Sequence, residues 1–449
     1  MTAVSDSIIF RNIFATPEST AIWSDERRTA YYLLFEKCLA EAQADLGIIP
    51  QKACDEIVKR CKTEYLDWEE LRRQTEIIGY PVLPVVKQLV KGVNDVEPGL
   101  GEYSHWGATT QDVTDTATVL QIRDTLQILQ DAINDIVKST RMLAGRHKET
   151  PMAARSNLQQ AVPITYGFKL ARLLATFYRH QQRLNELRER ILVLEFSGAA
   201  GTLATLDKDN AMKCQKLLAE KLGLKVPAIA WHTERDNIAE FGAFLAMLTS
   251  TCAKFALDTK IQMSTEVGEV SEPYVPHRGS SSTMPQKRNP ISCAYITSMN
   301  ATVRQLSASL FEAMVEDFER STGPWEIEWV VLPQICTLSH ATLMQTRNLI
   351  DGLEVHTDAM RKNLQLTHGA IVSEAVMMEL GKTIGRQYAH DLVYDLCRRA
   401  QREDKALVDL LDEHPEVNLT RDRLQQLCDP NNYLGLSVEM TEQVLEQLK

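Results

Sequence analysis

The stretch from Asp115 to Ile136, DTATVLQIRDTLQILQDAINDI, decides the fold class of this chain. Its large apolar residues recur at spacings of three and four: Val119, Ile122, Leu126, Leu129, Ile133 and Ile136. In an α-helix this spacing places the side chains in one stripe along one face. The stretch therefore predicts a long helix with one buried side, and the chain is expected to be all-α.

Four further tracts show the same helical pattern. One covers residues 168–194 and ends near Gly198, where a glycine favours a helix end. The others cover residues 236–267, 291–320 and 331–363. Stripes of this length need partner helices along their whole length, so five of them predict a central helix bundle with a shared core.

The segments on either side of this bundle contain shorter helical stretches that are interrupted by proline. The breaks before the bundle are at Pro17, Pro50, Pro81 and Pro84, and those after it are near Pro415 and Pro430. Proline interrupts a helix because it lacks the backbone N–H and clashes with the preceding turn. We therefore expect three domains, at residues 1–111, 112–364 and 365–449, in which strands play little part.

Composition limits the classes of partner. The 449 residues carry a formal net charge of -11 at pH 7, so a broad basic face for nucleic acid or anionic lipid is not expected. The nine cysteines are scattered without CxxC pairs, which predicts reduced thiols rather than disulfides or a zinc site. The N-terminus lacks a basic segment followed by an apolar stretch, and no run of about eighteen apolar residues is apparent. These features predict a cytoplasmic protein that neither binds nucleic acid nor enters a membrane.

The run Gly279–Pro290, GSSSTMPQKRNP, gathers hydroxyl groups, an ammonium group and an amide in one segment. Glycine and successive hydroxyl residues disfavour a helix interior, so the segment predicts a loop, and its polar groups suit an anionic substrate. A loop of this composition is a candidate closing lid. The alternative interpretation is a solvated turn before a helix.

This run resembles the signature loop of the fumarase/aspartase superfamily, Gly-Ser-Ser-x-Met-Pro-x-Lys-x-Asn-Pro. The resemblance implies that Ser281 acts as the catalytic general base and that Lys287 and Asn289 hold a substrate carboxylate. Ser282 and Thr283 are expected to complete the substrate-binding part of the loop. The resemblance also implies an all-α, three-domain fold whose central bundles assemble into a homotetramer with a twenty-helix core. Active sites in such a tetramer combine segments of different subunits, and no cofactor or metal is expected.

A second candidate segment, Ser104–Asp112, lies just before the first long helix. A helix N-terminus favours a carboxylate, because the free backbone N–H groups and the helix dipole attract negative charge. The segment resembles the first conserved region of the superfamily, which implies that a substrate carboxylate is bound by Thr109, Thr110 and Gln111. Alternatively, Thr110 or Asp112 serves only to cap the helix.

A third segment, Arg155-Ser156-Asn157-Leu158-Gln159, resembles the second conserved region, usually Arg-Thr-His-x-Gln. The histidine of that pattern donates a proton to the leaving group in the adenylosuccinate-cleaving members, whereas an amide cannot transfer a proton at neutral pH. Asn157 therefore argues against elimination of an amine by that route. We expect Ser156 and Asn157 to contact substrate, with Asn157 orienting a carboxylate or carbonyl. The alternative is that Asn157 caps the helix that follows.

The segment Trp231–Asp236, WHTERD, is similar to a segment of the 3-carboxymuconate lactonizing branch of the superfamily. His232 and Asp236 could share a helical face, but no third ligand is close in sequence, so a salt-linked surface is favoured over a metal site. By resemblance, Glu319, Arg320 and Glu328 are expected to line the substrate site. Salt bridges between bundle helices are the alternative explanation of these charges.

Four tracts resemble the branch of the superfamily that decarboxylates trans-aconitate to itaconate: 106–112, 154–158, 323–329 and 386–391. Loss of CO2 from trans-aconitate leaves an allylic carbanion conjugated with the remaining carboxylates. Lys287 and Asn289 are expected to stabilise this carbanion. It must then be protonated at carbon, and Ser281 is the first candidate donor and His105 the second.

The resemblance thus implies a cofactor-independent lyase that acts on a small unsaturated polycarboxylate, with trans-aconitate as the expected substrate. The alternative is a 3-carboxy-cis,cis-muconate cycloisomerase or a fumarate-releasing lyase resembling adenylosuccinate lyase, either of which would use the same loop. A non-catalytic structural protein is a third class. It is disfavoured because Ser281, Lys287 and Asn289 are all present.

Overall fold

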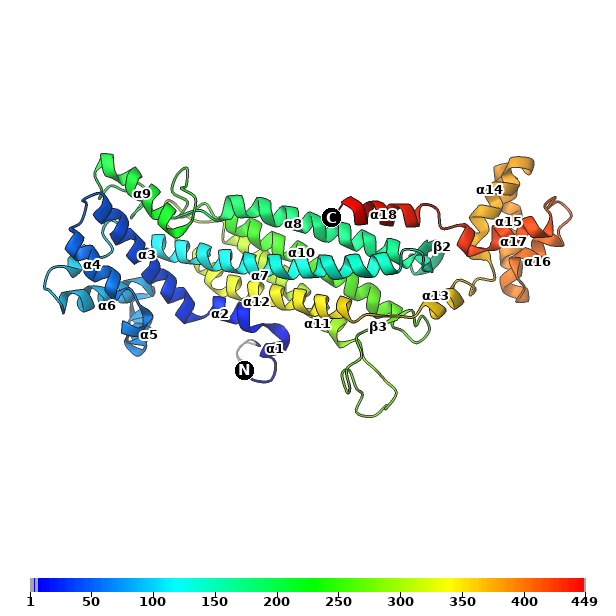
Figure 1. Ribbon diagram of the computed structural model, residues 1–449, viewed down its shortest axis with the longest axis horizontal. Helices are drawn as coiled ribbons and strands as arrows, with labels where there is room; N and C mark the ends of the chain where they lie inside the picture. Colours follow the sequence, from blue (N-terminus) through cyan, green and yellow to red (C-terminus); the bar gives the residue numbers. More distant parts are fainter. Residues whose placement is uncertain (1–3, 5–6, 448–449) are drawn as a thin grey trace. The chain divides into compact units, whose positions relative to one another are not determined.

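The computed structural model describes residue 4 and residues 7–447 (Figure 1). The N-terminal helices are α1 (Arg11–Phe14), α2 (Pro17–Ile22), α3 (Asp25–Asp45), α4 (Gln51–Arg60), α5 (Trp68–Ile78) and α6 (Val82–Asn94). The long helices are α7 (Thr110–Arg146), α8 (Tyr166–Ile191), α10 (Asp236–Gln262), α11 (Ile291–Glu312) and α12 (Pro324–Asp351), and the shorter α9 (Lys208–Leu222) lies between α8 and α10 in sequence. The C-terminal helices are α13 (Thr357–Asn363), α14 (Ser373–Ile384), α15 (Arg386–Glu403), α16 (Leu407–Asp412), α17 (Arg421–Cys428) and α18 (Ser437–Gln447).

Strands form only a small part of the described chain. They are β1 (Pro151–Ser156), β2 (Gln159–Thr165), β3 (Val270–Ser271) and β4 (Glu354–Val355). β1 pairs with β2 and β3 with β4, both antiparallel. The expected all-α class is thus confirmed.

The five long helices confirm the expectation from periodicity. Every apolar residue of the predicted stripe between Val119 and Ile136 is fully buried in α7. In α8, the buried residues of the second tract include Phe177, Leu184 and Leu187. The apolar stripes of the sequence therefore mark the faces on which these helices pack.

The last two predicted tracts end differently from the expectation. α11 ends at Glu312 rather than near residue 320, and the tract 331–363 divides into the end of α12, β4 and α13. α12 begins at Pro324, directly after Gly323 with a φ of 94°, because proline is tolerated in a first turn and glycine accepts left-handed backbone. Shortly after α12, a Cβ on Gly352 would lie 2.7 Å from Pro273, so only glycine fits there.

Prolines in the N-terminal segment mark the starts of helices. Pro17 is the first residue of α2 and follows Thr16, which forms a reciprocal capping box with Ser19. Pro50 and Pro81 directly precede α4 and α6. The break predicted at Pro84 is wrong, because Pro84 lies in the first turn of α6, where a missing N–H costs no helical hydrogen bond.

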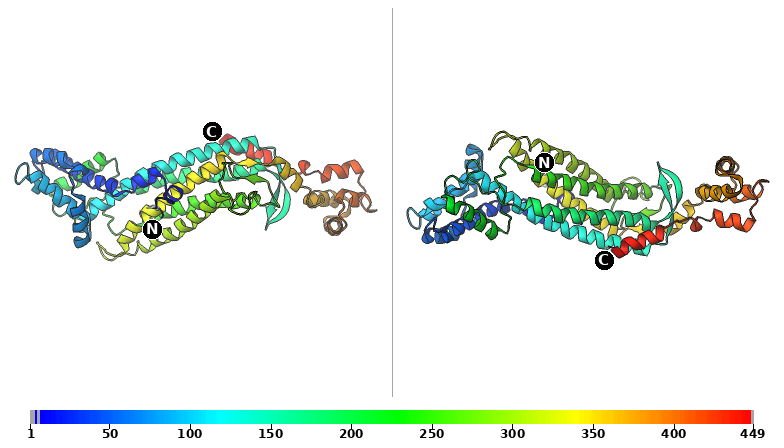
Figure 2. Two further views of the ribbon diagram at one scale, coloured as in Figure 1. Left: turned by 90° about the horizontal axis from the view of Figure 1, so that it is seen from below. Right: turned by 90° about the horizontal axis from the view of Figure 1, so that it is seen from above.

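The chain groups into two compact units, and the long helices pass through both. Unit 1 consists of Met1–Ala132, Gln181–Ser250 and Ser298–Leu343, and unit 2 consists of Ile133–His180, Thr251–Thr297 and Met344–Lys449. Within each unit, Figure 2 shows segments of the long helices packed alongside one another. This grouping follows contacts rather than consecutive segments, so the division into domains at residues 1–111, 112–364 and 365–449 stays a prediction.

Buried polar contacts connect the helices of unit 1. Asn300 Oδ1 of α11 accepts hydrogen bonds from the hydroxyls of Thr249 and Ser250 of α10, both at 3.1 Å. Gln121 of α7 donates to the carbonyl of Ile22 at the end of α2 (2.7 Å). Such bonds fix the register of neighbouring helices, because a buried polar group without a partner is costly.

Ion pairs connect the helices of unit 2. Lys169 of α8 contacts Asp258 of α10 (2.5 Å), and Arg347 of α12 contacts Asp135 of α7 (2.9 Å). The C-terminal helices α14 to α17 form a separate apolar core that includes Leu380, Leu396, Leu407 and Leu424. The helices α13 and α18, which precede and follow this core in sequence, also belong to unit 2.

The helix α10 is long and apolar enough to cross a membrane by length and composition alone. The helix is not one uninterrupted apolar run, because Thr249 and Ser250 follow its apolar stretch 241–248, so the expectation from the sequence is not contradicted. Moreover, 56% of its most apolar window is buried inside the protein, a pattern that core helices of soluble proteins share.

The nine cysteines are all free thiols; six are buried and three are partly exposed. Burial raises the pKa of every one of them, for example to about 11 at Cys38 and to about 12 at Cys214. These thiols are therefore protonated at neutral pH.

Candidate active site

The loop Gly279–Pro290 lies in unit 2 directly before α11, and its two ends are joined. Ser280 and Arg288 form an antiparallel bridge, and Asn289 donates from its backbone N and from Nδ2 to Gly279 O (2.8 and 2.9 Å). Gly279 has a φ of 74°, and a Cβ there would lie 2.4 Å from Asn289 O. Only glycine therefore fits at this position, and Asn289 closes the base of the loop.

Charged groups fix this base to the rest of unit 2. Arg288 forms an ion pair with Glu354 (3.2 Å) and donates a hydrogen bond to the carbonyl of Glu272. The Glu272 carboxylate in turn accepts hydrogen bonds from the backbone N of Ser292 and of Cys293 (3.2 and 2.8 Å), at the start of α11. A carboxylate is favoured at a helix N-terminus, so Glu272 holds together the loop base and the helix that follows.

The tip of the loop, from Ser282 to Lys287, is exposed. Ser281 Oγ accepts hydrogen bonds from the backbone N of Thr283 (3.3 Å) and Met284 (3.1 Å), which orients the hydroxyl. Lys287 makes no ion pair with any of the described residues. A fixed base with an exposed cationic tip suits a lid for an anionic substrate, and the predicted roles of Ser281, Ser282, Thr283, Lys287 and Asn289 stay predictions.

The second candidate segment lies in unit 1, at the start of α7. Asp112 Oδ2 accepts a hydrogen bond from Thr109 N (2.9 Å), which confirms the capping role considered for Asp112. Arg320 Nη1 donates to Thr109 Oγ1 (3.0 Å) and to Ala199 O (3.2 Å). The Arg320 guanidinium group and the Thr109 hydroxyl therefore lie together at the N-terminus of α7, which begins at Thr110. This arrangement attracts a carboxylate.

Gln111 faces the interior rather than this surface and is buried. Its Nε2 donates to the carbonyl of His232 (2.8 Å) and to Asp115 Oδ2 (3.2 Å). With its amide group engaged in this way, Gln111 fixes the first turn of α7. Its predicted contact with substrate stays a prediction.

His105 stands before this turn and contacts a buried carboxylate. Its Nδ1 lies 2.6 Å from Glu36 Oε1 of α3, and its φ of 58° is left-handed. Burial lowers the pKa of His105, but the charge and hydrogen bond of Glu36 and the charge of Asp112 raise it, and the net shift is upward. A histidine held by a carboxylate in this way is a candidate proton donor, as the sequence analysis expected.

Asp112 is also the centre of a buried network. Its carboxylate accepts hydrogen bonds from the backbone N of Ser197 (3.1 Å) and Gly198 (3.0 Å), in addition to that of Thr109, and lies 2.8 Å from His232 Nε2. The same ring nitrogen lies 3.6 Å from Glu195 Oε1. Asp112 and Glu195 are fully buried and His232 nearly so.

The pKa values of this network reflect burial and mutual charge. Burial raises the pKa of Glu195 to about 7. Burial lowers the pKa of His232, but the hydrogen bond to Asp112 and the negative charges of Glu195 and Asp112 raise it, and the net shift is upward. The network therefore retains protons at a pH at which an isolated carboxyl or imidazole would release them.

A second buried network surrounds Arg235, which precedes α10. Its guanidinium group donates to Asp115 of α7 (2.8 and 3.1 Å) and to Glu328 of α12 (2.9 and 2.6 Å). Trp325 Nε1 donates to Asp115 as well (3.0 Å). Glu328 is therefore a salt-bridge residue between bundle helices, as the alternative interpretation held, and the surface expected for the segment WHTERD is wrong because His232 and Arg235 are buried.

The third candidate segment forms a hairpin in unit 2. Asn157 and Leu158 connect β1 to β2 and have left-handed φ angles of 51° and 64°. Asparagine tolerates this conformation better than most residues. The alternative that Asn157 caps a helix is wrong, because α8 begins only at Tyr166. Ser156 and Asn157 both lie at the exposed turn, where Asn157 Nδ2 is 3.4 Å from Ser156 Oγ.

Comparison with known proteins adds to this geometry. The family model described as "Lyase" matches residues 11–304, and that described as "Adenylosuccinate lyase C-terminus" matches residues 369–444. This chain belongs to the fumarase/aspartase superfamily of lyases.

Three relatives illustrate its place in the superfamily. The chain is 54% identical to "Trans-aconitate decarboxylase 1" of Mycosarcoma maydis, over 97% of this chain and 88% of that protein. It is 40% identical to a 3-carboxy-cis,cis-muconate cycloisomerase of Pseudomonas aeruginosa, over 100% and 98% of the two chains. The crystal structure of a 3-carboxy-cis,cis-muconate lactonizing enzyme from Pseudomonas putida is similar with a TM-score of 0.92 and 38% identity, over 98% and 99% of the chains. The superfamily fold expected from the signature loop is thereby confirmed.

Several residues of the candidate site were not found by sequence reasoning. Glu36 and Glu195 lie on other segments than the superfamily motifs, and only the fold brings them to His105 and His232. Glu316 lies within the electrostatic reach of Arg235 and Glu328; its carboxylate oxygens are enclosed, and burial raises its pKa to about 7. The sequence signal for such residues is weak, since an isolated acidic residue is usually solvated.

One group of potential metal ligands is found among the described residues, and its ligand atoms lie within 4.8 Å of one another. It consists of Asp112, Glu195 and His232. However, the 2.8 Å between Asp112 and His232 is a hydrogen-bond distance, and both oxygens of Asp112 already accept backbone hydrogen bonds. The group therefore fits a proton-sharing network better than a metal centre.

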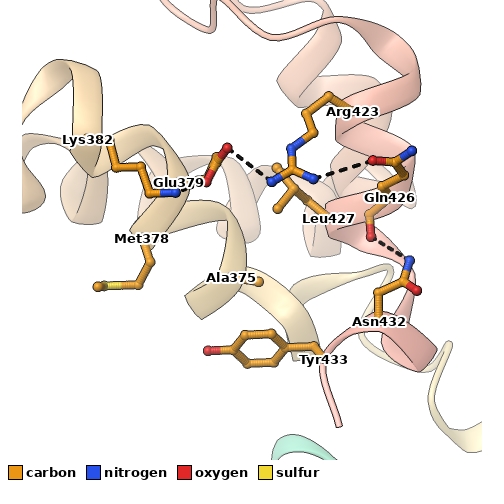
Figure 3. Close-up of a pocket in the computed structure, with 9 residues that line it drawn as sticks. All are labelled: Ala375, Met378, Glu379, Lys382, Arg423, Gln426, Leu427, Asn432 and Tyr433. Atoms are coloured by element: carbon orange, nitrogen blue, oxygen red, sulfur yellow. Dashed lines mark hydrogen bonds and ion pairs between the residues drawn. The ribbon is translucent and has the colours of Figure 1, made fainter. Parts of the chain in front are cut away.

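A pocket of about 470 Å³ lies among the C-terminal helices of unit 2, between α14, α17 and the residues near Tyr433 (Figure 3). It contains none of the predicted site residues. Its cationic groups, Lys382 and Arg423, are both paired with Glu379 (2.5 and 3.1 Å). The pocket thus offers no unpaired charge comparable with that of Lys287.

Proposed function

We propose that the protein is a cofactor-independent decarboxylase that converts trans-aconitate to itaconate and CO2. The observation that carries this proposal is the 54% identity, over 97% of the chain, to a protein named trans-aconitate decarboxylase. The geometry supports it, because two places on the chain suit carboxylates: the Arg320–Thr109 turn and the Lys287 loop. A substrate with three carboxylates requires several such groups.

The proposed reaction breaks the bond between the CH2 carbon and its carboxylate. CO2 leaves without the bonding electron pair, which becomes an allylic carbanion delocalised toward the other carboxylates. Lys287 and Asn289 stabilise this negative charge, as preorganised donors do at developing anions. One proton is then added at the former vinyl carbon, which gives the CH2=C group of itaconate.

Two groups are candidates for the proton donor. Ser281 has an oriented hydroxyl on the loop, and His105 is held by Glu36 and has a raised pKa. The exposed amide of Asn157 cannot donate a proton to an amine leaving group, but decarboxylation releases CO2 and needs no such donor. This chemistry favours decarboxylation over elimination of an amine.

A cycloisomerase acting on 3-carboxy-cis,cis-muconate is the second candidate function, supported by 40% identity over the full chain. Proton NMR of the purified protein decides between them, with trans-aconitate, cis-aconitate, 3-carboxymuconate and adenylosuccinate tested separately. We expect vinyl signals of itaconate from trans-aconitate alone. Muconolactone or fumarate as the product, with trans-aconitate unchanged, would reject the decarboxylase proposal.

We further propose that the protein is a cytoplasmic homotetramer whose active sites combine the segments near His105, Asn157 and Ser281 from different subunits. The exposed loop tip and the exposed hairpin turn support this proposal, because both leave candidate site residues uncovered within one chain. Mixing the inactive variants Asn157→Ala and Ser281→Ala should restore part of the activity. No recovery despite subunit exchange, shown by native mass spectrometry, would count against shared sites.

A further inference from the structure

The Asp112 carboxylate joins three segments of unit 1 that surround the candidate carboxylate turn. It accepts hydrogen bonds from Thr109 N on the turn itself and from Ser197 N and Gly198 N on the segment after α8. His232, just before α10, contacts the same carboxylate. A displacement of Asp112 would therefore move both the turn and the segment beside it.

Arg320 contacts the same two segments from another side. It donates to the Thr109 hydroxyl and to the carbonyl of Ala199, which directly follows Gly198. The distance between Thr109 and Ala199 is thus fixed on one side by a buried carboxylate and on the other by a guanidinium group, which is half-buried. Asp112 and Arg320 therefore bind the same turn and the same neighbouring segment.

Glu195 completes the arrangement behind His232. Its Oε2 accepts a hydrogen bond from Trp231 N (2.8 Å), and its backbone exchanges hydrogen bonds with the Thr116 hydroxyl of α7 (2.9 and 3.2 Å). Oε1 of Glu195 has no hydrogen-bond partner among the described residues and faces His232 Nε2 at 3.6 Å. A proton on that nitrogen would therefore lie close to two carboxylates, and a hydrogen bond donated from it to Asp112 would keep that carboxylate in place.

We propose that Asp112, His232 and Glu195 form a buried proton-sharing unit that positions the Thr109–Thr110 turn and Arg320 for a substrate carboxylate. His232 is a positioning residue in this unit, since it acts on substrate only through Asp112. The inference rests on the proposed function for its substrate, a polycarboxylate, but not on the chemical step.

The test compares the wild type with His232→Gln and with a matched control, His180→Gln. Like His232, His180 is a buried histidine. Its hydrogen-bond partner is the Thr251 hydroxyl (2.8 Å) rather than a carboxylate, and it lies in the middle of α8 and in unit 2. With trans-aconitate, His232→Gln should raise KM about tenfold while kcat stays within about threefold, the pattern of lost binding shared by ground and transition states. The control should match the wild type. A folded His232→Gln protein with the wild-type KM would overturn the proposal.

Binding of propane-1,2,3-tricarboxylate, measured by calorimetry, separates this inference from the decarboxylase proposal because it needs no turnover. Above about pH 7 this ligand is fully ionised. As pH rises further, loss of protons from the unit adds negative charge near the turn, so wild-type affinity should fall. Other charged groups near the turn also affect the pH dependence of binding: His105 with Glu36, and Arg235 with Asp115 and Glu328. These groups are present in every variant. Only the difference in pH dependence between the variants and the wild type is therefore assigned to the Asp112, His232 and Glu195 unit.

Two variants test that difference. His232→Gln should bind the ligand more weakly and with less dependence on pH, and Glu195→Gln, which keeps the side-chain volume and an acceptor for Trp231 N, should lose part of the pH dependence. If His232→Gln does not fold, Glu195→Gln alone decides the outcome.

Equal affinity and equal pH dependence in wild type and folded variants would reject the positioning role, even if the wild type decarboxylates trans-aconitate. Tight, pH-dependent ligand binding without itaconate formation would instead reject only the decarboxylase proposal.

Discussion

Replacing Lys287 with alanine is expected to lower kcat for trans-aconitate by at least about a hundredfold, the scale for losing a group that stabilises a developing anion. Lys287 is exposed at the tip of the loop and makes no ion pair with the described residues, so its ammonium group is available for substrate. Ser281→Ala should reduce kcat by a similar factor of about a hundred if the serine transfers the proton. Steady-state kinetics with itaconate detected by absorbance or NMR would measure both effects.

The control for this prediction is Lys382→Ala. Lys382 is another exposed lysine, but it lies on α14 and is paired with Glu379. It should leave kcat unchanged, which would exclude a general effect of removing positive charge. Near-normal turnover in Lys287→Ala or Ser281→Ala would contradict the assignment of the loop as the catalytic segment.

Replacing Arg235 with leucine is expected to lower the free energy of unfolding by about 3–5 kcal/mol, the cost of leaving a buried ion pair with one partner missing. Arg235 is completely buried and bridges Asp115 and Glu328, so the leucine variant would contain two buried carboxylates without their cation. Urea unfolding followed by circular dichroism would measure the change.

The matched control is Arg190→Leu. Arg190 also forms a bidentate contact with a carboxylate, that of Glu240, but both side chains are exposed. Exposed pairs contribute little to stability, so this variant should unfold close to the wild-type midpoint. If Arg235→Leu were as stable as Arg190→Leu, the network around Arg235 would not be a principal stabilising element of unit 1.

Much of the fold could be predicted from the sequence because helical periodicity is a local signal. The stripe from Val119 to Ile136 gave the position and the buried face of α7 correctly. The boundary at Glu312 was missed because the apolar residues that follow it, such as Val315 and Phe318, continue the composition of a helix although they are exposed. Local pattern does not reveal which apolar residues are covered.

The candidate site was predictable only in part, for a related reason. The superfamily motifs identified the turn at Thr109, the turn at Asn157 and the loop around Ser281. They did not identify Glu36 or Glu195. Glu36 contacts His105, which is more than sixty positions away in the sequence, and Glu195 lies near His232, which is about forty positions away. The role of a buried charged group depends on the residues that it contacts. When those residues are distant in sequence, the contacts can be found only from the folded structure.

The raised pKa of all nine cysteines, six of which are buried, has a practical consequence for following the loop. Because every thiol is protonated at neutral pH and six of the nine are also buried, alkylating reagents should react with the native protein slowly. A single cysteine introduced at the exposed Gln286 would then be the one site that a maleimide dye labels quickly. The emission of that dye would report in real time whether the loop tip moves when a polycarboxylate binds, without removing any native thiol.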